Sequence, residues 1–201
     1  MNDKILHILE QIKALEEEIQ SELNKQGSRW FYEIKGKRIE FERAIREKHR
    51  SLKQGLFHWF LTARPLNYLT APIIYGMAVP LVIFDICVTF YQLTCFPIYG
   101  ISRVRRSDYI VFDRRHLAYL NIIEKFDCLY CSYGNGLVAY ATEILARTEQ
   151  YFCPIKHAQK VAGTHARYQY FLDFGDAADL HKKFEEIRVA LVKEDENATK
   201  L

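Results

Sequence analysis

Two short cysteine motifs supply the residue types that could bind a metal ion. Cys128 and Cys131 form a C-x2-C pair, and Cys153 and His157 follow as a C-x3-H pair. Thiolate and imidazole ligands suit tetrahedral Zn²⁺ or a small iron centre, and each pair is compact enough to bind one ion from a single turn. The sequence therefore predicts a structural zinc site made by Cys128, Cys131, Cys153 and His157, with iron or an iron–sulfur centre as the alternative cofactor.

Three other interpretations of these motifs stay open. The cysteines could be small buried side chains of a core. The C-x2-C pair could cycle through a disulfide, although the βαβ pattern of thioredoxin-like proteins is absent. The two pairs could also bind separate partners or a second subunit. A helix over residues 137–152 would span about 24 Å, so the pairs meet only if it breaks or the chain folds back.

Composition and motifs argue against several common function classes. The 201 residues are 49% apolar and 14% aromatic, which is typical of a folded chain. The net charge of +3 is too small to indicate nucleic-acid binding. The sequence lacks the nucleotide-binding motif G-x-G-x-x-G, the hydrolase motif G-x-S-x-G and the metalloprotease motif H-E-x-x-H. The sequence therefore favours a non-enzymatic function.

A long apolar segment, residues 65–102, predicts insertion into a lipid bilayer. Between residues 66 and 101 the one side chain expected to carry a charge is Asp85. A bilayer span needs about 20 apolar residues, which this stretch exceeds. Asp85 either has a partner or a role, because an intramembrane acid is costly, or lies near the surface and is solvated.

Prolines and flanking charges make the topology of this segment ambiguous. Pro72, Pro80 and Pro97 fall where a straight helix would kink or break. Lys and Arg residues precede and follow the segment, so the positive-inside rule selects no orientation. A re-entrant helical hairpin turning near Pro80, with both ends cytoplasmic, fits this pattern somewhat better than a single span.

The first 64 residues are expected to form two helical segments. Residues 1–26 are predicted to be a coiled-coil-like arm, because its apolar side chains recur at three- and four-residue steps: Ile5, Ile8, Ile12, Leu15, Ile19 and Leu23. This stripe could equally pack on its own domain or bind a second copy or another protein through residues 1–24. Residues 27–64 are basic and bracketed by aromatics, which predicts an amphipathic helix on an anionic membrane surface.

The rest of the chain is expected to be a small helical domain, residues 103–175, followed by a C-terminal helix and polar tail, residues 176–201. Asp113 is a good N-cap for a helix that continues to Lys125. The sequence Ser132-Tyr133-Gly134-Asn135-Gly136 is rich in turn-forming residues, so Cys128 and Cys131 are predicted to lie in a knuckle rather than inside a helix. The predicted fold is therefore mainly α, with a Cys/His knuckle.

The block from the apolar segment through CLYCSYGNG and ARTEQYFCPIKHA, roughly residues 57–160, resembles a family of uncharacterised bacterial membrane-associated proteins. The resemblance implies a bacterial membrane protein but no reaction. The charged first 25 residues do not resemble a cleavable signal peptide, so the five cysteines are expected in a reducing compartment. We therefore expect an inner-membrane protein whose soluble parts face the cytoplasm. Its expected function is that of a non-enzymatic assembly module with a structural zinc, and the alternative is a redox-active or metal-handling membrane protein.

Overall fold

The computed structural model describes residues 7, 11–12, 14–19, 21–22, 25, 32–35, 38–41, 43–53, 55, 58, 61–62 and 64–198. The protein is mainly helical, as the sequence predicts. It divides into two compact units, one made by residues 1–63 and 113–127 and the other by residues 64–112 and 128–201. The second unit contains the long apolar segment and both Cys/His motifs.

In the N-terminal arm, the residues that the structure describes are helical. Ile12, Leu15 and Ile19 of the predicted stripe are 47–59% exposed. The remaining stripe residues, Ile5, Ile8 and Leu23, lie outside the described residues. A coiled-coil seam is therefore not confirmed, and the stripe residues that are described are not covered by the chain itself.

A β-hairpin replaces part of the basic amphipathic helix expected over residues 27–64. Strand β1 (Tyr32–Lys35) pairs antiparallel with β2 (Arg38–Phe41), and helix α2 (Arg43–Ser51) follows. Tyr32 pairs with Phe41 and Ile34 with Ile39, so apolar and charged residues alternate with the period of a strand. The prediction of one helix here is wrong because this period of two was read as a helical period.

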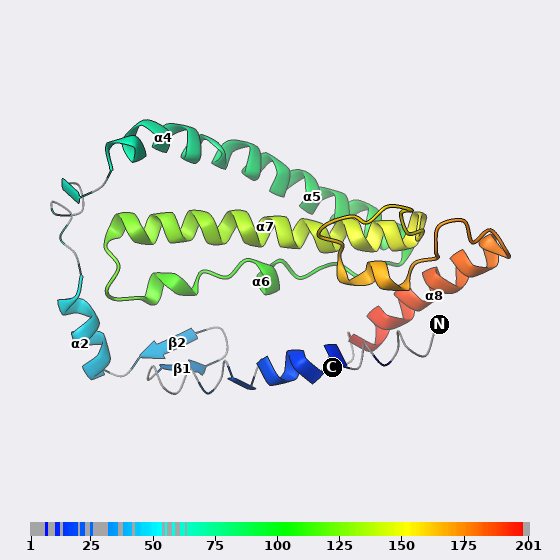
Figure 1. The fold of residues 1–201 in the computed structure, drawn as a ribbon, viewed down its shortest axis with the longest axis horizontal. Helices are drawn as coiled ribbons and strands as arrows, with labels where there is room; N and C mark the ends of the chain where they lie inside the picture. Colours follow the sequence, from blue (N-terminus) through cyan, green and yellow to red (C-terminus); the bar gives the residue numbers. More distant parts are fainter. Residues whose placement is uncertain are drawn as a thin grey trace. The chain divides into compact units, whose positions relative to one another are not determined.

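The apolar segment forms two helices that run on from one another, not a hairpin. Helix α4 (Pro65–Gly76) and helix α5 (Ala78–Tyr99) meet at Met77, which keeps helical backbone angles. They follow one another along a single curved path (Figure 1). Pro80 lies in the first turn of α5, where a backbone N–H would have no partner within the helix, so it does not reverse the chain. The predicted turn near Pro80 is therefore not formed.

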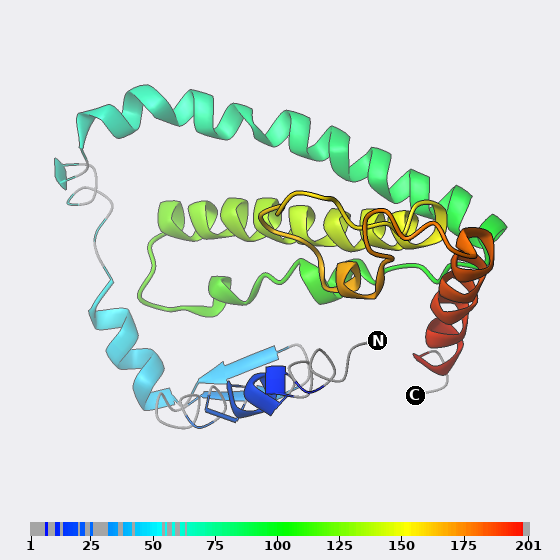
Figure 2. The same ribbon diagram turned by 45° about the vertical axis from the view of Figure 1, so that its right-hand side comes forward.

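The second unit is built around residues 128–152 of one long helix, α7 (Ile122–Phe152), whose first residues belong to the other unit. Its start is fixed by a capping box, in which Asn121 Oδ1 accepts from the N–H groups of Ile123 and Glu124, both at 2.9 Å, and Glu124 accepts from the Asn121 N–H at 2.8 Å. The predicted helix from Asp113 to Lys125 is instead a short 3-10 helix, η1 (Asp113–His116), followed by this cap. Helices α5 and α7 run in the same direction and converge toward their C-terminal ends (Figure 2), and Asp85 and Gln92 of α5 contact Tyr133 and Tyr140 of α7 in that order.

Close packing explains one of the two glycines in the middle of α7. A Cβ on Gly136 would come within 2.6 Å of the Tyr109 carbonyl oxygen and 2.9 Å of Ile110 Cα. At Gly134 the nearest atom would be Leu81 Cδ1 at 3.5 Å, an ordinary contact distance. The predicted knuckle at 132–136 is therefore wrong. Gly136 serves the close approach of the 109–110 backbone to α7, and the helix continues through this sequence.

Residues 101–112 return along α5 and α7 in the opposite direction. Gly100 ends α5 in the left-handed conformation with φ +67°, and the Ile101 N–H donates to the Phe96 carbonyl at 2.9 Å. Except for α6 (Arg106–Tyr109), this return is not helical. Phe96, Leu137, Tyr140, Ile144 and Leu191 are fully or almost fully buried in the core between these elements.

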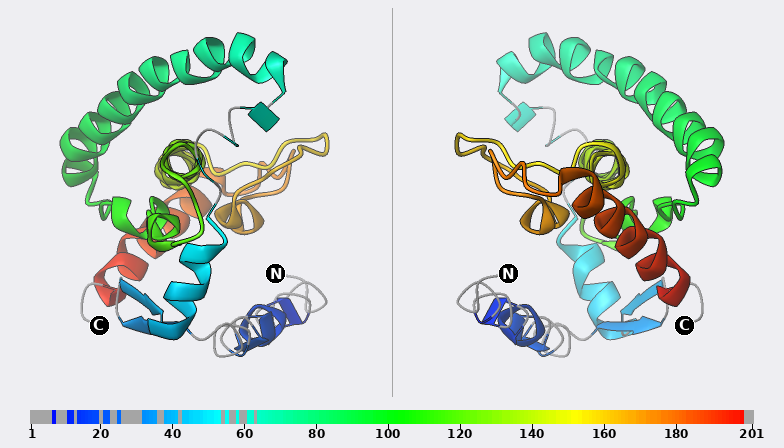
Figure 3. Two further views of the ribbon diagram at one scale, coloured as in Figure 1. Left: turned by 90° about the vertical axis from the view of Figure 1, so that its left-hand side faces the viewer. Right: turned by 90° about the vertical axis from the view of Figure 1, so that its right-hand side faces the viewer.

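The chain after α7 packs against the C-terminal half of that helix. Residues 153–175 form an irregular segment with a 3-10 turn, η2 (Ala166–Tyr170), and one parallel bridge between Ile155 and Leu172. Helix α8 (Leu180–Ala198) follows, as the sequence predicts for the C-terminal part. Figure 3, in which α7 is seen nearly end-on, shows α4–α5 on one side of α7 and the 153–175 segment on another.

Candidate functional site

The four predicted metal ligands lie near opposite ends of α7. Cys128 and Cys131 are inside the helix, whereas Cys153 follows its last residue. Cys131 and Phe152 are 21 residues apart in α7, which corresponds to about 32 Å. The structure therefore does not bring the two pairs together within one chain.

The second pair is held by its own contacts. The His157 N–H donates to the Tyr168 hydroxyl at 2.6 Å, and the two rings stack with centroids 6.3 Å apart. Cys153 is exposed, and so is Cys131. Within the described part of the chain, no three His, Cys, Asp or Glu residues are grouped closely enough to hold a metal ion. One zinc bound by all four residues stays a prediction that requires α7 to break between the pairs.

The outer face of α4–α5 is a long exposed apolar surface. Among the described residues, this is the one helical stretch that is long and apolar enough to cross a membrane, with 35 residues from Pro65 to Tyr99. From Pro72 to Leu93 every exposed side chain is apolar or a cysteine. The most exposed large side chains of this stretch are Ile73, Val79, Ile86 and Phe90, each 64–73% exposed. We call this surface the α4–α5 outer face.

The polar side chains in the central part of α5 point the other way, toward the protein. Asp85, Thr89 and Gln92 lie at three- and four-residue steps on one side of the helix and are buried or half-buried. A surface helix in water shows the opposite arrangement, with its apolar stripe turned inward. This reversed polarity is typical of a helix whose outer surroundings are apolar.

Asp85 has a definite partner. Its Oδ2 atom accepts from Arg106 Nη2 at 2.6 Å and from the Tyr133 hydroxyl at 2.9 Å, and Thr89 Oγ1 donates to Oδ1 at 3.3 Å. The Asp85 side chain is 14% exposed and that of Arg106 is 45% exposed. The hydrogen bond to Asp85 raises the pKa of Arg106, and burial followed by the Asp85 contact raises that of Tyr133. The Arg106 guanidinium therefore stays charged beside the carboxylate.

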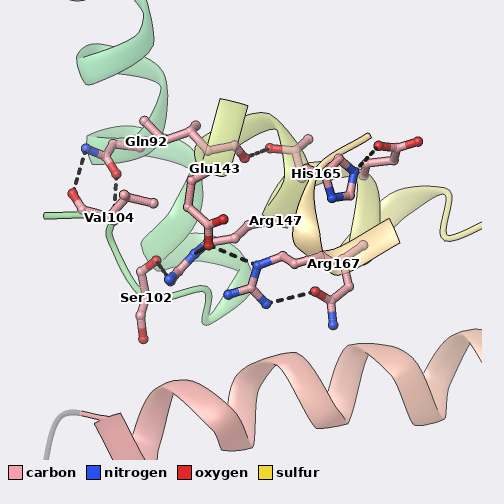
Figure 4. Close-up of polar contacts among 11 residues, drawn as sticks. Gln92, Ser102, Val104, Glu143, Arg147, His165 and Arg167 are labelled. Atoms are coloured by element: carbon pink, nitrogen blue, oxygen red, sulfur yellow. Dashed lines mark hydrogen bonds and ion pairs between the residues drawn. The ribbon is translucent and has the colours of Figure 1, made fainter. Parts of the chain in front are cut away.

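Gln92 of α5 pairs with the returning chain. Its Oε1 atom accepts from the Val104 N–H at 3.0 Å and its Nε2 donates to the Val104 carbonyl at 3.5 Å (Figure 4). Nε2 also donates to the Tyr140 hydroxyl. The Gln92 amide thus supplies hydrogen-bond partners for the N–H and carbonyl groups of Val104, which is not part of a helix.

A second polar cluster joins α7 to the segments on either side of it. Glu143 Oε1 accepts from Nε of both Arg147 and Arg167 at 2.9 Å (Figure 4). Arg147 also donates to the Ser102 carbonyl at 2.8 Å, and Arg167 to Gln150 Oε1 at 2.9 Å. Each charged group of this cluster is matched by a group of opposite charge or an acceptor. We therefore interpret it as a structural clamp on the 153–175 segment.

The polar face of α5 was predictable from the spacing of its polar residues, but the sequence analysis did not identify it. Asp85, Thr89 and Gln92 are spaced i, i+4 and i+7, which places them on one helix face. Arg106 and Tyr133 had no comparable signal, because their proximity to Asp85 depends on the reversal at Gly100 and on a continuous α7.

No protein-family model, curated protein or solved structure matches this chain. The resemblance to bacterial membrane-associated proteins therefore stays a prediction, and the interpretation of the site depends on its geometry.

Proposed function

We propose that this protein is a membrane-associated, non-enzymatic module whose α4–α5 outer face binds a lipid bilayer. The observation that carries the proposal is the reversed polarity of α5. Its outer side chains are apolar, whereas Asp85, Thr89 and Gln92 face the protein. The folded part around α7 is then the portion that the helix holds at the membrane. In a bacterium this membrane would be the inner one, with the soluble parts in the cytoplasm.

The energetics favour lipid over water at this face. Complete burial of one large apolar side chain contributes about 1.5–3 kcal/mol. Ile73, Val79, Ile86 and Phe90 are each at least 64% exposed and lie on a face without a charged side chain between residues 72 and 93. Contiguous apolar surface of this kind marks an interaction site in a folded protein.

A charge placed on the outer face is expected to weaken membrane binding. Phe90→Glu should lower the partitioning of the full chain into lipid vesicles by at least about tenfold, because about 1.4 kcal/mol corresponds to a factor of ten and an acid in hydrocarbon costs more. Flotation on a density gradient measures the bound fraction. The wild-type protein should also stay in the membrane fraction through high-salt and carbonate washes.

Phe174→Glu is the matched control, because Phe174 in the 153–175 segment is 69% exposed and Phe90 is 67% exposed. The control should float like the wild type. Salt-extractable wild-type protein, or equal flotation of both variants, would contradict lipid binding by this face and point to a protein that covers it.

We also propose that residues 1–24 bind a second copy of the chain or another protein. Supporting this are the exposed stripe residues Ile12, Leu15 and Ile19. Deleting residues 1–24 is expected to lower the oligomeric state in detergent or remove a bound partner, and to leave the rest folded. Light scattering coupled to gel filtration measures the mass, and circular dichroism the helix content. An unchanged mass with no partner lost would show that the arm serves neither role.

A further inference from the structure

We infer that α4–α5 binds in the plane of one leaflet, with the chain before and after it on the same side of the membrane. This inference deepens the membrane association proposed above and rests on it. Three features of the second unit carry it: the path of residues 101–112, the position of the Asp85–Arg106 pair, and the length of the apolar segment.

The returning segment runs beside the middle of the apolar helix. Val104 pairs with Gln92, and Arg106 pairs with Asp85. If α5 crossed the bilayer with this packing intact, residues 101–106 would lie at the same depth. Most of them are not helical, and Arg103, Arg105 and Arg106 are exposed. Hydrocarbon tolerates neither lipid-exposed irregular backbone nor such a cluster of cations.

In a spanning orientation, the Asp85–Arg106 pair would lie near the centre of the bilayer, where a charge costs the most. Residues 72–93 would span about 33 Å, close to the thickness of the hydrocarbon core, and Asp85 lies near their middle. Arg106 is 45% exposed, so a spanning helix would place a charged side chain in contact with lipid near the bilayer centre. In a helix that lies in the leaflet plane, Asp85 is on the protein side and Arg106 can reach water or lipid headgroups.

The length of the apolar segment also fits an in-plane helix. The 35 residues of α4–α5 correspond to about 52 Å, well beyond the roughly 30 Å of the hydrocarbon core. A helix in the plane has no such limit and buries its apolar face about 5–10 Å into the headgroup and acyl boundary. The outer face then inserts along its whole length, and the protein beneath stays in the aqueous phase.

Depth measurements on three positions of one helix face test this inference. Val79, Ile86 and Leu93 are seven residues apart and exposed. Each is replaced singly by cysteine in a full chain whose five native cysteines, Cys87, Cys95, Cys128, Cys131 and Cys153, are serines. A spin label on each reports its depth by collisions with oxygen and a nickel chelate in phosphatidylethanolamine–phosphatidylglycerol vesicles. An in-plane helix gives three similar depths.

The alternative outcomes separate this inference from the proposed function. A helix that spans with residues 72–93 places Val79 and Ile86 at similar depths on either side of the bilayer centre and Leu93 about 10 Å closer to the surface, because seven helical residues rise by that amount. That result, with flotation intact, overturns the in-plane geometry and leaves membrane binding standing. Water-exposed labels at all three positions overturn both. The cysteine-free chain must float and show the helix content of the wild type before labelling.

Labelling of the two flanks gives a second, independent readout. Arg64 and Arg103, both exposed, are each replaced by cysteine in the cysteine-free chain. Bacterial cells that express these variants are treated with a membrane-impermeant maleimide. Both positions should react only after the cells are opened. Reaction of one position alone in intact cells would place the flanks on opposite sides and overturn the inference.

Discussion

Gly136→Ala is expected to destabilise the protein, whereas Gly134→Ala, two residues earlier in the same helix, is expected to stabilise it. Alanine is favoured over glycine inside a helix by about 1 kcal/mol, and this gain applies at both positions. At position 136 the new Cβ would meet the Tyr109 carbonyl oxygen at 2.6 Å and Ile110 Cα at 2.9 Å. Both are backbone atoms, so the 109–110 segment must move, at a cost of about 1–3 kcal/mol.

The difference between the two variants is therefore expected to be about 2 kcal/mol in the free energy of unfolding, with opposite signs relative to the wild type. Chemical unfolding in detergent, followed by circular dichroism at 222 nm, measures it. Two equally stabilised variants would show that residues 109–110 do not approach α7 closely.

The same glycines show where the sequence was misleading. Gly134 and Gly136 beside Ser132 and Asn135 are typical of a turn, and the knuckle was predicted from them. Yet Tyr133, Leu137, Tyr140 and Ile144 continue a helical spacing through this stretch. In α7 the latter three are buried and Tyr133 is half-buried. The tertiary contact that makes a glycine useful inside a helix is not visible in local sequence.

The apolar segment was predictable in extent but not in shape. Composition alone identified residues 65–102, and the structure has helices from Pro65 to Tyr99. The hairpin was wrong because Pro80 lies in the first turn of α5, where proline is tolerated, and not in a helix interior. The expectation that both flanks lie on one side therefore no longer depends on a hairpin, and rests instead on the proposed in-plane geometry.

The candidate site was predicted from residue type, and the structure emphasises different residues. Cys128, Cys131, Cys153 and His157 have the types and local spacing of metal ligands, but α7 separates the two pairs. Asp85 drew attention because it is the one acid in an apolar segment, and it proves to be paired with Arg106. A long-range pair of this kind depends on the chain path, which local spacing does not encode.

Asp85→Ala is expected to lower the free energy of unfolding by about 2 kcal/mol. It removes the acceptor of Arg106, Tyr133 and Thr89 together, and a hydrogen bond to a charged group contributes about 1.5–3 kcal/mol when it is removed. Because Arg106 is partly exposed and solvent screens its charge, the loss in free energy of unfolding should lie toward the lower part of that range. Unfolding in detergent measures it.

Asp173→Ala is the matched control for burial. Lys156 Nζ lies 2.8 Å from Asp173, almost the distance of the Arg106–Asp85 pair, but the Asp173 side chain is 82% exposed and that of Asp85 only 14%. The hydrogen bond from Lys156 lowers the pKa of Asp173. Solvent screens such a pair, so this variant should change the free energy of unfolding by less than about 1 kcal/mol.

A double-mutant cycle assigns the effect to the pair itself. Arg106→Ala alone should cost less than Asp85→Ala, because Tyr133 and Thr89 still donate to the carboxylate. The double variant should cost less than the sum of the two single variants, with a coupling energy of about 1 kcal/mol, as expected for residues in direct contact. Strict additivity would mean that Arg106 does not pair with Asp85 in solution. It would also weaken the in-plane argument, which uses that pair to place residues 101–106 beside the middle of α5.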